Sequence, residues 1–364
     1  MNKKFYFTCI NDSVTEGGMS RNKAFHDYFK AKKFKIVNIS KSKLYLLPFN
    51  ILYTLFIILF TKKNTLFFQQ FSLFYLFTPF IYNNNSIVTI LRKIFAYTAQ
   101  RNRVIIEIND LVWEQALDLK LQLKPCLQPF EKFILTLPEV EYIVASYQMR
   151  EFIIKEYQIN PNTVSVIING CHSFDAIMDY QIERYLPNFN NLRSSSLVLV
   201  YAGALNKGRQ IELMLNQLSK LKSICVVLIG TGGEWIKHQD LNDNIMYLGA
   251  FEESVAQKIV SACDFGLIPY DETKMYYNLC YPTKASFYIS SGIPFISTPL
   301  AELQYNFPDN PAAIFMPIEQ WNEYIINASK FDVIELKKMA LKQSSTLNWK
   351  YLFNNNLLMQ SITE

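Results

Sequence analysis

The feature that most constrains the fold is a regular alternation of short apolar strands and helix-length segments along the whole chain of 364 residues. In the first half, strands are predicted at Lys4–Ile10, Thr65–Gln70 and Arg103–Ile108, and each precedes a segment with helical periodicity. A strand–helix–strand order predicts parallel sheets that are covered by helices on both faces. The chain is therefore expected to be α/β, and its length allows two domains with separate cores.

The domain boundary is predicted in a polar segment, residues 171–196, that has no regular apolar periodicity. We expect a first doubly wound domain at residues 1–170 and a second at 197–346. The last segment, 347–364, is predicted to form one helix that packs back on the first domain. Two doubly wound domains that face each other bring the C-terminal ends of their strands to a shared cleft, where ligands bind.

The residue composition argues against a metal site. The six cysteines form no C-x-x-C pair, the three histidines have no ligand spacing, and the chain contains no Asp-x-Asp. We therefore expect neither a metal nor another cofactor. Scattered cysteines also indicate a reducing compartment, which is the cytoplasm.

The N-terminal part is strongly basic. Residues 1–103 hold 16 lysines and arginines against 3 aspartates and glutamates, a net charge of +13. Two apolar stretches, Leu44–Phe60 and Leu66–Tyr82, are flanked by basic residues, and both are too interrupted to be membrane-spanning helices. The combination predicts peripheral binding to the anionic inner face of the plasma membrane. The alternative is that both stretches are wholly core. No nucleic-acid motif is present, so nucleic acid is not an expected partner.

The segment Tyr281–Ile296 predicts an anion site. It reads as a loop, a helix and a Gly-x-Pro turn into a strand, with Pro282 at the helix start and Gly292 at its end. Lys284 then lies near the N-terminus of a helix, where backbone N–H groups and the ammonium both favour a phosphate. A solvated surface lysine is the alternative interpretation.

Glycine-containing loops follow several predicted strands. In Glu16–Arg21, Gly17 and Gly18 allow close approach of a ligand and Ser20 can cap the next helix; a plain turn is the alternative.

A second loop, Gly203–Arg209, nearly matches the phosphate loop of ATPases. Arg209 and Gln210 stand where that motif needs lysine and a hydroxyl residue, so an ATPase is rejected. Its two cations still suit a diphosphate.

Taken in order, the motifs resemble those of GT-B glycosyltransferases of the bacterial group 1 (GT4-like) kind. The segments that carry the resemblance are Ile168-Asn169-Gly170, Tyr201-Ala202-Gly203, Lys207-Gly208, Leu228–Gly232, Tyr247-Leu248-Gly249, Ala262–Pro269 and Pro282–Pro294, with Arg103–Asp110 and Gly17-Gly18 in the first half. The resemblance implies two Rossmann-like domains that face a central cleft. It also implies a nucleotide-sugar donor in the second domain, with protein cations replacing a metal ion at the diphosphate.

Site residues follow from the resemblance position by position. The donor diphosphate would contact Gly203, Lys207, Arg209 and Lys284. The nucleotide would contact Thr231, Gly232, Tyr247, Phe251, Tyr270 and Thr283. The acceptor side of the cleft would include Gly17, Gly18, Ser20 and Arg21, with Asp110 as the catalytic carboxylate and Glu107 as the alternative.

Two positions depart from the family pattern. Many relatives carry a glutamate five residues before the glycine of Gly-x-Pro, where this chain has Phe287, and most carry arginine where this chain has Ala204. The pattern is more similar to the divergent branch that contains bacterial galactofuranosyltransferases and the glucosyltransferases of streptococcal adhesins.

The resemblance implies a metal-independent hexosyltransferase that uses a UDP-sugar. The expected acceptor is a glycan or an undecaprenyl-linked intermediate of surface polysaccharide (O-antigen or capsule) synthesis. The missing glutamate keeps open an alternative, a non-catalytic GT-B partner that stabilises another glycosyltransferase. Whether the chain forms a homo-oligomer is also open.

Overall fold

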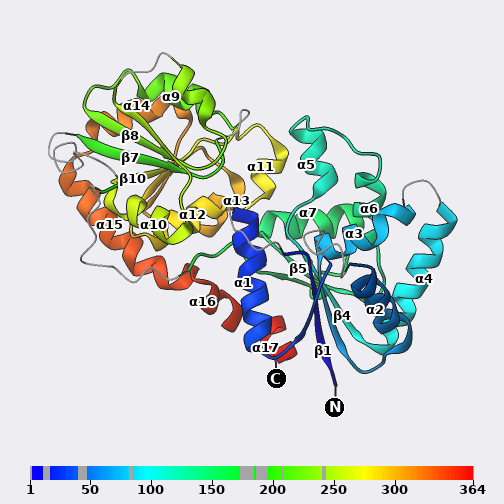
Figure 1. Ribbon diagram of the computed structural model, residues 1–364. Coiled ribbons are helices and arrows are strands. Elements are labelled where there is room, and N and C mark those ends of the chain that lie inside the picture. Colours follow the sequence, from blue (N-terminus) through cyan, green and yellow to red (C-terminus); the bar gives the residue numbers. More distant parts are fainter. Residues whose placement is uncertain are drawn as a thin grey trace. The chain divides into compact units, whose positions relative to one another are not determined.

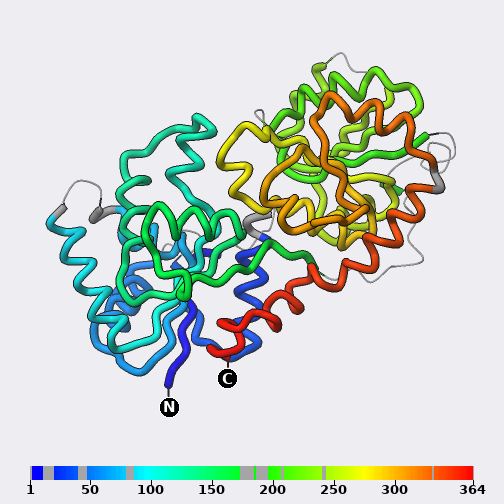
Figure 2. Tube along the Cα trace, turned by 180° about the vertical axis from the view of Figure 1, so that it is seen from behind, coloured from blue at the N-terminus to red at the C-terminus, as the bar shows by residue number. Residues whose placement is uncertain are grey.

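The computed structural model describes residues 2–10, 17–39, 47–81, 85–172, 184–185, 196–205, 209–239 and 243–363. The chain divides into two compact units (Figures 1 and 2), one made of Met1–Val14, Gly18–Ile168 and Phe353–Glu364, the other of Thr15–Gly17 and Asn169–Leu352. Most of the predicted linker 171–196, and also Lys207, lie outside the described residues. The expected α/β class is confirmed, with a six-stranded parallel sheet in each unit.

The first unit contains a sheet in the order β2-β1-β3-β4-β5-β6. Its strands are β1 (Lys4–Thr8), β2 (Lys35–Asn38), β3 (Thr65–Gln69), β4 (Arg103–Ile108), β5 (Glu141–Val144) and β6 (Val164–Val166). Its helices are α1 (Gly17–Ala31), α2 (Leu47–Phe60), α3 (Gln70–Ile81), α4 (Asn85–Arg101), α5 (Val112–Asp118), α6 (Leu127–Ile134) and α7 (Tyr147–Tyr157). In this order the topological switch point lies between β1 and β3.

Aromatic side chains fill the centre of this first sheet. The rings of Phe7 on β1 and Phe68 on β3 stack with centroids 4.4 Å apart, and Tyr6 meets Phe67 on the opposite face at 5.7 Å. Both faces of β1 and β3 are buried, which explains why these strands are continuous apolar runs rather than alternating ones.

The C-terminal segment differs from the single helix predicted at 347–364. It forms two helices, α16 (Trp349–Asn354) and α17 (Leu357–Thr363). The break has a local cause, because the side chain of Asn356 accepts a hydrogen bond from the N–H of Met359 and caps the second helix. Phe353 packs on α1, 4.9 Å from the ring of Phe25 and 4.6 Å from that of Tyr28.

The second unit contains a sheet in the order β12-β11-β10-β7-β8-β9. Its strands are β7 (Leu197–Ala202), β8 (Ile224–Ile229), β9 (Ile245–Gly249), β10 (Phe265–Ile268), β11 (Phe295–Ser297) and β12 (Ala313–Phe315). Its helices include α9 (Ile211–Leu218), α10 (Glu253–Ala262), α11 (Met275–Leu279), α12 (Thr283–Ser290), α13 (Ala301–Asn306), α14 (Trp321–Asn327) and α15 (Lys330–Ser344). This is the Rossmann order, and its switch point lies between β7 and β10.

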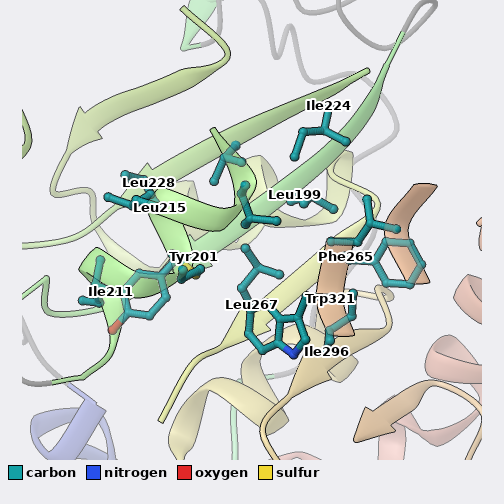
Figure 3. Close-up of a cluster of buried hydrophobic side chains, with 14 of the residues drawn as sticks. Leu199, Tyr201, Ile211, Leu215, Ile224, Leu228, Phe265, Leu267, Ile296 and Trp321 are labelled. Atoms are coloured by element: carbon teal, nitrogen blue, oxygen red, sulfur yellow. The ribbon is translucent and has the colours of Figure 1, made fainter. Parts of the chain in front are cut away.

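One face of the second sheet packs on α9 and α14. Figure 3 shows this cluster, in which Trp321 lies beside Leu267 and Ile296 of the strands. The other face carries α12, which contacts β10.

Tyr288 of α12 joins β7 and β10 at the switch point. The two strands are paired only at Phe265–Leu199 and Gly266–Val200. Beyond that, the Tyr288 hydroxyl accepts a hydrogen bond from the N–H of Ala202 (2.9 Å) and donates one to the carbonyl of Leu267 (3.1 Å). A Cβ atom at Gly266 would lie 2.3 Å from the Tyr288 ring, so only glycine leaves room for this side chain.

The two apolar stretches of the first unit have different environments. Helix α3 is mainly core, with Leu73, Leu76 and Phe77 buried, whereas α2 turns several phenylalanines to solvent. The wholly core alternative therefore fails for the first stretch, and in the second it is contradicted by Tyr75, which is exposed although most of its neighbours are buried. Within the described ranges, no helix combines the length and apolar character that crossing a bilayer requires.

Glu131 of α6 is a buried carboxyl in the first unit. It accepts hydrogen bonds from the backbone N–H of Trp113 (2.9 Å) and from the hydroxyl of Tyr157 (2.9 Å). Burial is the largest influence on its pKa and raises it to about 7, although both hydrogen bonds act in the opposite direction. Its ordinary value is 4.5.

We expect the Tyr288→Phe variant to lose about 1–3 kcal/mol of stability in the second unit, because a buried N–H and a buried carbonyl lose their partner. Hydrogen-exchange mass spectrometry should show faster exchange across the end of β7, with β8 as the internal reference. Tyr305→Phe, at an exposed position of α13, is the matched control. Unchanged exchange at Ala202 in Tyr288→Phe would contradict the role of the hydroxyl.

A second prediction concerns pH. Because the folded state holds the Glu131 proton more tightly than the unfolded chain, the contribution of this group is fully present below about pH 4.5 and is lost as the pH rises to about 7. We expect Glu131→Gln to exceed the wild type in free energy of unfolding by up to about 3 kcal/mol at pH 8, and the difference to shrink towards pH 5. Urea unfolding at both pH values measures this, with the exposed Glu151→Gln as control. A difference that does not depend on pH would refute it.

Candidate functional site

Lys284 lies at the switch point of the second sheet. Pro282 (φ −63°) precedes α12, and Lys284 is in the first turn, only 6% exposed. Its ammonium donates a hydrogen bond to the hydroxyl of Tyr270 (3.0 Å) and lies 4.9 Å from the ring centre of Tyr201. The expectation of a lysine at the start of a helix is confirmed, and the alternative of a solvated surface lysine is wrong.

Arg209 is a second cation in the same cluster. Its guanidinium lies 5.7 Å from the centre of the Tyr270 ring and donates to the carbonyl of Ala204 (3.3 Å). Among the described residues, no ion pair joins either Arg209 or Lys284 to a carboxylate. A buried cation without a counterion is costly, so the cluster is suited to an anion from solution.

Lys284 and Arg209 change the pKa of the Tyr270 hydroxyl, which lies beside both of them. Burial raises the pKa of Tyr270, but the charges of Lys284 and Arg209 outweigh burial and hold that pKa below its usual value. The phenol is also the group to which the Lys284 ammonium donates its hydrogen bond.

Two glycines let the backbone approach Lys284. Gly203 follows β7 with φ +136°, and a Cβ atom there would lie 2.8 Å from the Lys284 ammonium nitrogen. Gly230 follows β8 with φ +144°, and a Cβ atom there would lie 1.9 Å from the carbonyl oxygen of Gly203. The N–H of Gly203 donates to the carbonyl of Ile229 (2.8 Å), which fixes the two loops side by side.

The predicted nucleotide residues occupy the adjoining strand ends. The carbonyl of Thr231 accepts from the N–H of Leu205 (2.8 Å), Gly232 has φ +74°, and the Tyr247 hydroxyl donates to the carbonyl of Gly230 (3.1 Å). These residues therefore share one edge of the sheet.

The other two predicted nucleotide residues lie in neighbouring segments of the second unit. Phe251 follows β9, with its ring 5.7 Å from that of Tyr185, and Thr283 opens α12.

Sequence reasoning missed the tyrosines that surround Lys284. Tyr201 and Tyr277 contribute to the cluster, and the Tyr277 ring lies 4.7 Å from that of Tyr270. One signal was available for Tyr201, because strand residues two apart point to the same face and Gly203 was already a candidate. Tyr277 belongs to α11, and the sequence carried no comparable signal for it.

In the first unit, Asp110 lies directly after β4. The side chain of Gln70 joins this loop to β3, since its amide nitrogen donates to the carbonyl of Asp110 (2.7 Å) and its oxygen accepts from the N–H of Asn109 (3.2 Å). Asn109 also donates to the Asp110 carboxylate (2.8 Å). The carboxylate is thus held at the C-terminal edge of the sheet, partly exposed.

Glu107 and Arg21 have a different environment. They form a buried ion pair of 2.6 Å, and Arg21 also donates to the carbonyl of Ile167 (2.7 Å). This placement indicates a structural role for both and favours Asp110 as the carboxylate that an acceptor could reach. Gly17, Gly18 and Ser20 all lie in the first turn of α1, so the expectation that Ser20 caps this helix is wrong; the preceding loop is outside the described ranges.

Two further points bear on the donor side. Phe287, at the position of the family's glutamate, is half-buried on α12, its ring 6.4 Å from that of Tyr288. In the part of the chain that the structure describes, no three His, Cys, Asp or Glu side chains gather as metal ligands would.

Comparisons with known proteins identify the fold. No protein-family model matches the sequence, and a search of curated protein sequences gives no match. Solved structures are similar over nearly the full length.

Sucrose-phosphate synthase from Thermosynechococcus elongatus has a TM-score of 0.67 at 13% identity, over 96% of both chains. WaaG, a glycosyltransferase involved in lipopolysaccharide biosynthesis, has a TM-score of 0.64 at 10% identity, over 96% of this chain and 98% of WaaG. Anabaena HepE in complex with UDP-glucose has a TM-score of 0.63 at 10% identity, over 99% of this chain and 98% of HepE. At identities this low the similarity concerns the fold, and the chain has the GT-B fold of these glycosyltransferases.

Proposed function

We propose that the protein is a glycosyltransferase that moves a hexose from a UDP-sugar to a glycan or lipid-linked acceptor. The observation that carries the proposal is the buried Lys284 ammonium, which together with Arg209 lacks an ion-paired carboxylate among the described residues. A site with a buried lysine and a half-buried arginine at a Rossmann switch point suits the diphosphate of a nucleotide sugar. HepE, which has the same fold, was solved with UDP and with UDP-glucose.

Lys284 and Arg209 would stabilise the diphosphate that leaves the donor sugar. As the sugar–phosphate bond breaks, negative charge develops on the leaving diphosphate. Lys284 and Arg209 are fixed in a buried cluster, so they stabilise this charge without having to reorganise. Their positive charge also does what a divalent metal ion does elsewhere, which is the basis for proposing that no metal is needed.

Asp110 is the residue that we assign to the acceptor. Its carboxylate follows β4 and is held by Asn109, at the edge of the first sheet where ligands bind in this topology. There it would orient the acceptor hydroxyl or receive its proton. The proposal of a surface-polysaccharide acceptor is supported by WaaG, a glycosyltransferase of similar fold that is involved in lipopolysaccharide biosynthesis.

One observation keeps a second function in view. Helix α12, which would adjoin the ribose, has Phe287 at the position of the family's glutamate and contains no acidic side chain. A GT-B partner subunit that stabilises another glycosyltransferase would need no donor contacts. Such a protein would not bind UDP, so the first experiment below separates the two.

We expect Lys284→Met to weaken UDP binding by about 10- to 100-fold, because it removes charge-assisted hydrogen bonds to the diphosphate. The wild type should prefer UDP to UMP, and the variant should lose that preference. Its melting temperature should stay the same or rise, since a buried charge is removed. Titration calorimetry with UDP and UMP, with thermal unfolding alongside, measures both effects.

The control for this experiment is Lys220→Met, at an exposed position of the same unit. A Lys284→Met protein that still prefers UDP as the wild type does would overturn the site. Absence of UDP binding by the wild type would overturn the enzyme proposal and favour the partner subunit.

Metal removal gives an independent test. We expect EDTA treatment to leave UDP affinity and UDP-sugar turnover unchanged, because protein cations neutralise the diphosphate. A panel of UDP-hexoses, assayed for release of UDP with and without added Mg²⁺ and Mn²⁺, measures this. Turnover that appears only with added metal would refute metal independence and leave the Lys284 site standing.

A further inference from the structure

Helix α2 turns a row of large apolar side chains to solvent, unlike an ordinary surface helix, although Ile57 and Ile58 are buried on its other side. Four large apolar side chains, Phe49, Leu52, Phe56 and Phe60, are 55–69% exposed. At 100° per residue they fall within an arc of about 80°, so they form one continuous row along the helix. A surface helix normally turns its apolar stripe inward.

The polar residues of α2 face the protein instead. The side chain of Asn50 donates to the carbonyl of Asn38 on β2 (2.8 Å), and Thr54 is fully buried with its hydroxyl bonded to the carbonyl of Asn50 (2.7 Å). Both polar groups are satisfied by the backbone. The outward direction of the phenylalanines is therefore fixed by the packing of the opposite side of the helix.

Helix α4 extends this surface. It contacts α2 and lies beside it in Figures 1 and 2. Thr98 donates to the carbonyl of Ile58 (2.9 Å), and Arg101 donates to the carbonyls of Leu59 (3.2 Å) and Thr61 (2.8 Å).

The outer face of α4 includes apolar and basic side chains. Ile90, Lys93 and Tyr97, spaced by three and four residues, are exposed on it. We call the outer faces of α2 and α4 the α2/α4 surface.

The segment of the chain that carries the α2/α4 surface has charges of one sign. Between Asp27 and Glu107 the sequence contains 12 lysines and arginines and no aspartate or glutamate. Lys62 and Lys63 are exposed directly after α2, and the Lys35 ammonium lies 4.6 Å from the ring centre of Tyr53 on α2. A partner for this surface must accept apolar side chains and be negatively charged around them.

We propose that the α2/α4 surface docks on an anionic lipid bilayer, with α2 lying in the headgroup region. The 14 residues of α2 are uncharged and span about 21 Å, shorter than the hydrocarbon core of about 30 Å, which suits a helix lying in the interface. The basic rim matches phospholipid headgroups. A second copy of the chain fits less well, because it would bring two basic surfaces together.

The experiment is co-sedimentation of the full chain with vesicles of phosphatidylcholine alone, or of phosphatidylcholine with 30% phosphatidylglycerol. We expect binding to the anionic vesicles that weakens at high salt. Phe56→Gln/Phe60→Gln should lower the binding constant by at least about tenfold, and Lys62→Gln/Lys63→Gln by a similar factor on anionic vesicles only. The matched control is Ile326→Gln/Ile334→Gln, two exposed isoleucines of the second unit.

A site-specific measurement sharpens the test. Tryptophan placed by Phe56→Trp should be quenched by lipids brominated on the acyl chains, and tryptophan placed by Ile326→Trp should not. Wild-type binding that is indifferent to anionic lipid, or equal binding by Phe56→Gln/Phe60→Gln, would overturn the proposal. The proposal would also be overturned if the wild type formed a dimer and did not bind vesicles, and if Phe56→Gln/Phe60→Gln made that dimer monomeric. UDP affinity, unchanged in all variants, keeps this test separate from the donor site.

Discussion

The hydroxyl of Tyr288 is the contact on which the second unit depends. It replaces the missing ladder between β7 and β10 at the point where the two strands separate. Lys284 lies one turn earlier on α12, and residues four apart share a helix face. The same contact that closes the sheet therefore also directs the ammonium to the strand ends. Gly266 permits this arrangement because it leaves space for the ring.

Each unit contains a buried cation, and the two cations have different partners. In the first unit Arg21 is paired with Glu107 and bonded to a backbone carbonyl, so its charge is compensated within the fold. In the second unit Lys284 has two tyrosines as neighbours, Tyr270 through its hydroxyl and ring and Tyr201 through its ring. Aromatic faces stabilise a cation less than a carboxylate does when the group is desolvated. The two cations thus differ in their partners, and this difference is the reason for proposing a ligand-binding role for Lys284 and a structural role for Arg21.

Much of the fold could be predicted from the sequence, because strands buried on both faces are continuous apolar runs such as Leu197–Ala202. The position of Lys284 in the first turn of a helix was predictable from its place after Pro282. The role of Tyr288 was not, because it depends on Gly266, a residue 22 positions away that only the tertiary structure brings into contact. The orientation of α2 was equally hidden, since a helix that is apolar all round gives no periodicity from which to infer the buried side. The sequence could not decide between Glu107 and Asp110 as the acceptor carboxylate, because they differ in burial, which only the structure shows.

The one-signed charge of the segment between Asp27 and Glu107 has a consequence for its response to acidity. This stretch contains no aspartate, glutamate, histidine or cysteine, so it has no side chain whose ordinary pKa lies between about 3 and 9. Its positive charge is the same in an acidified cell as in a neutral one. For the membrane contact that we propose, this stretch therefore offers no side chain through which a fall in pH could release it.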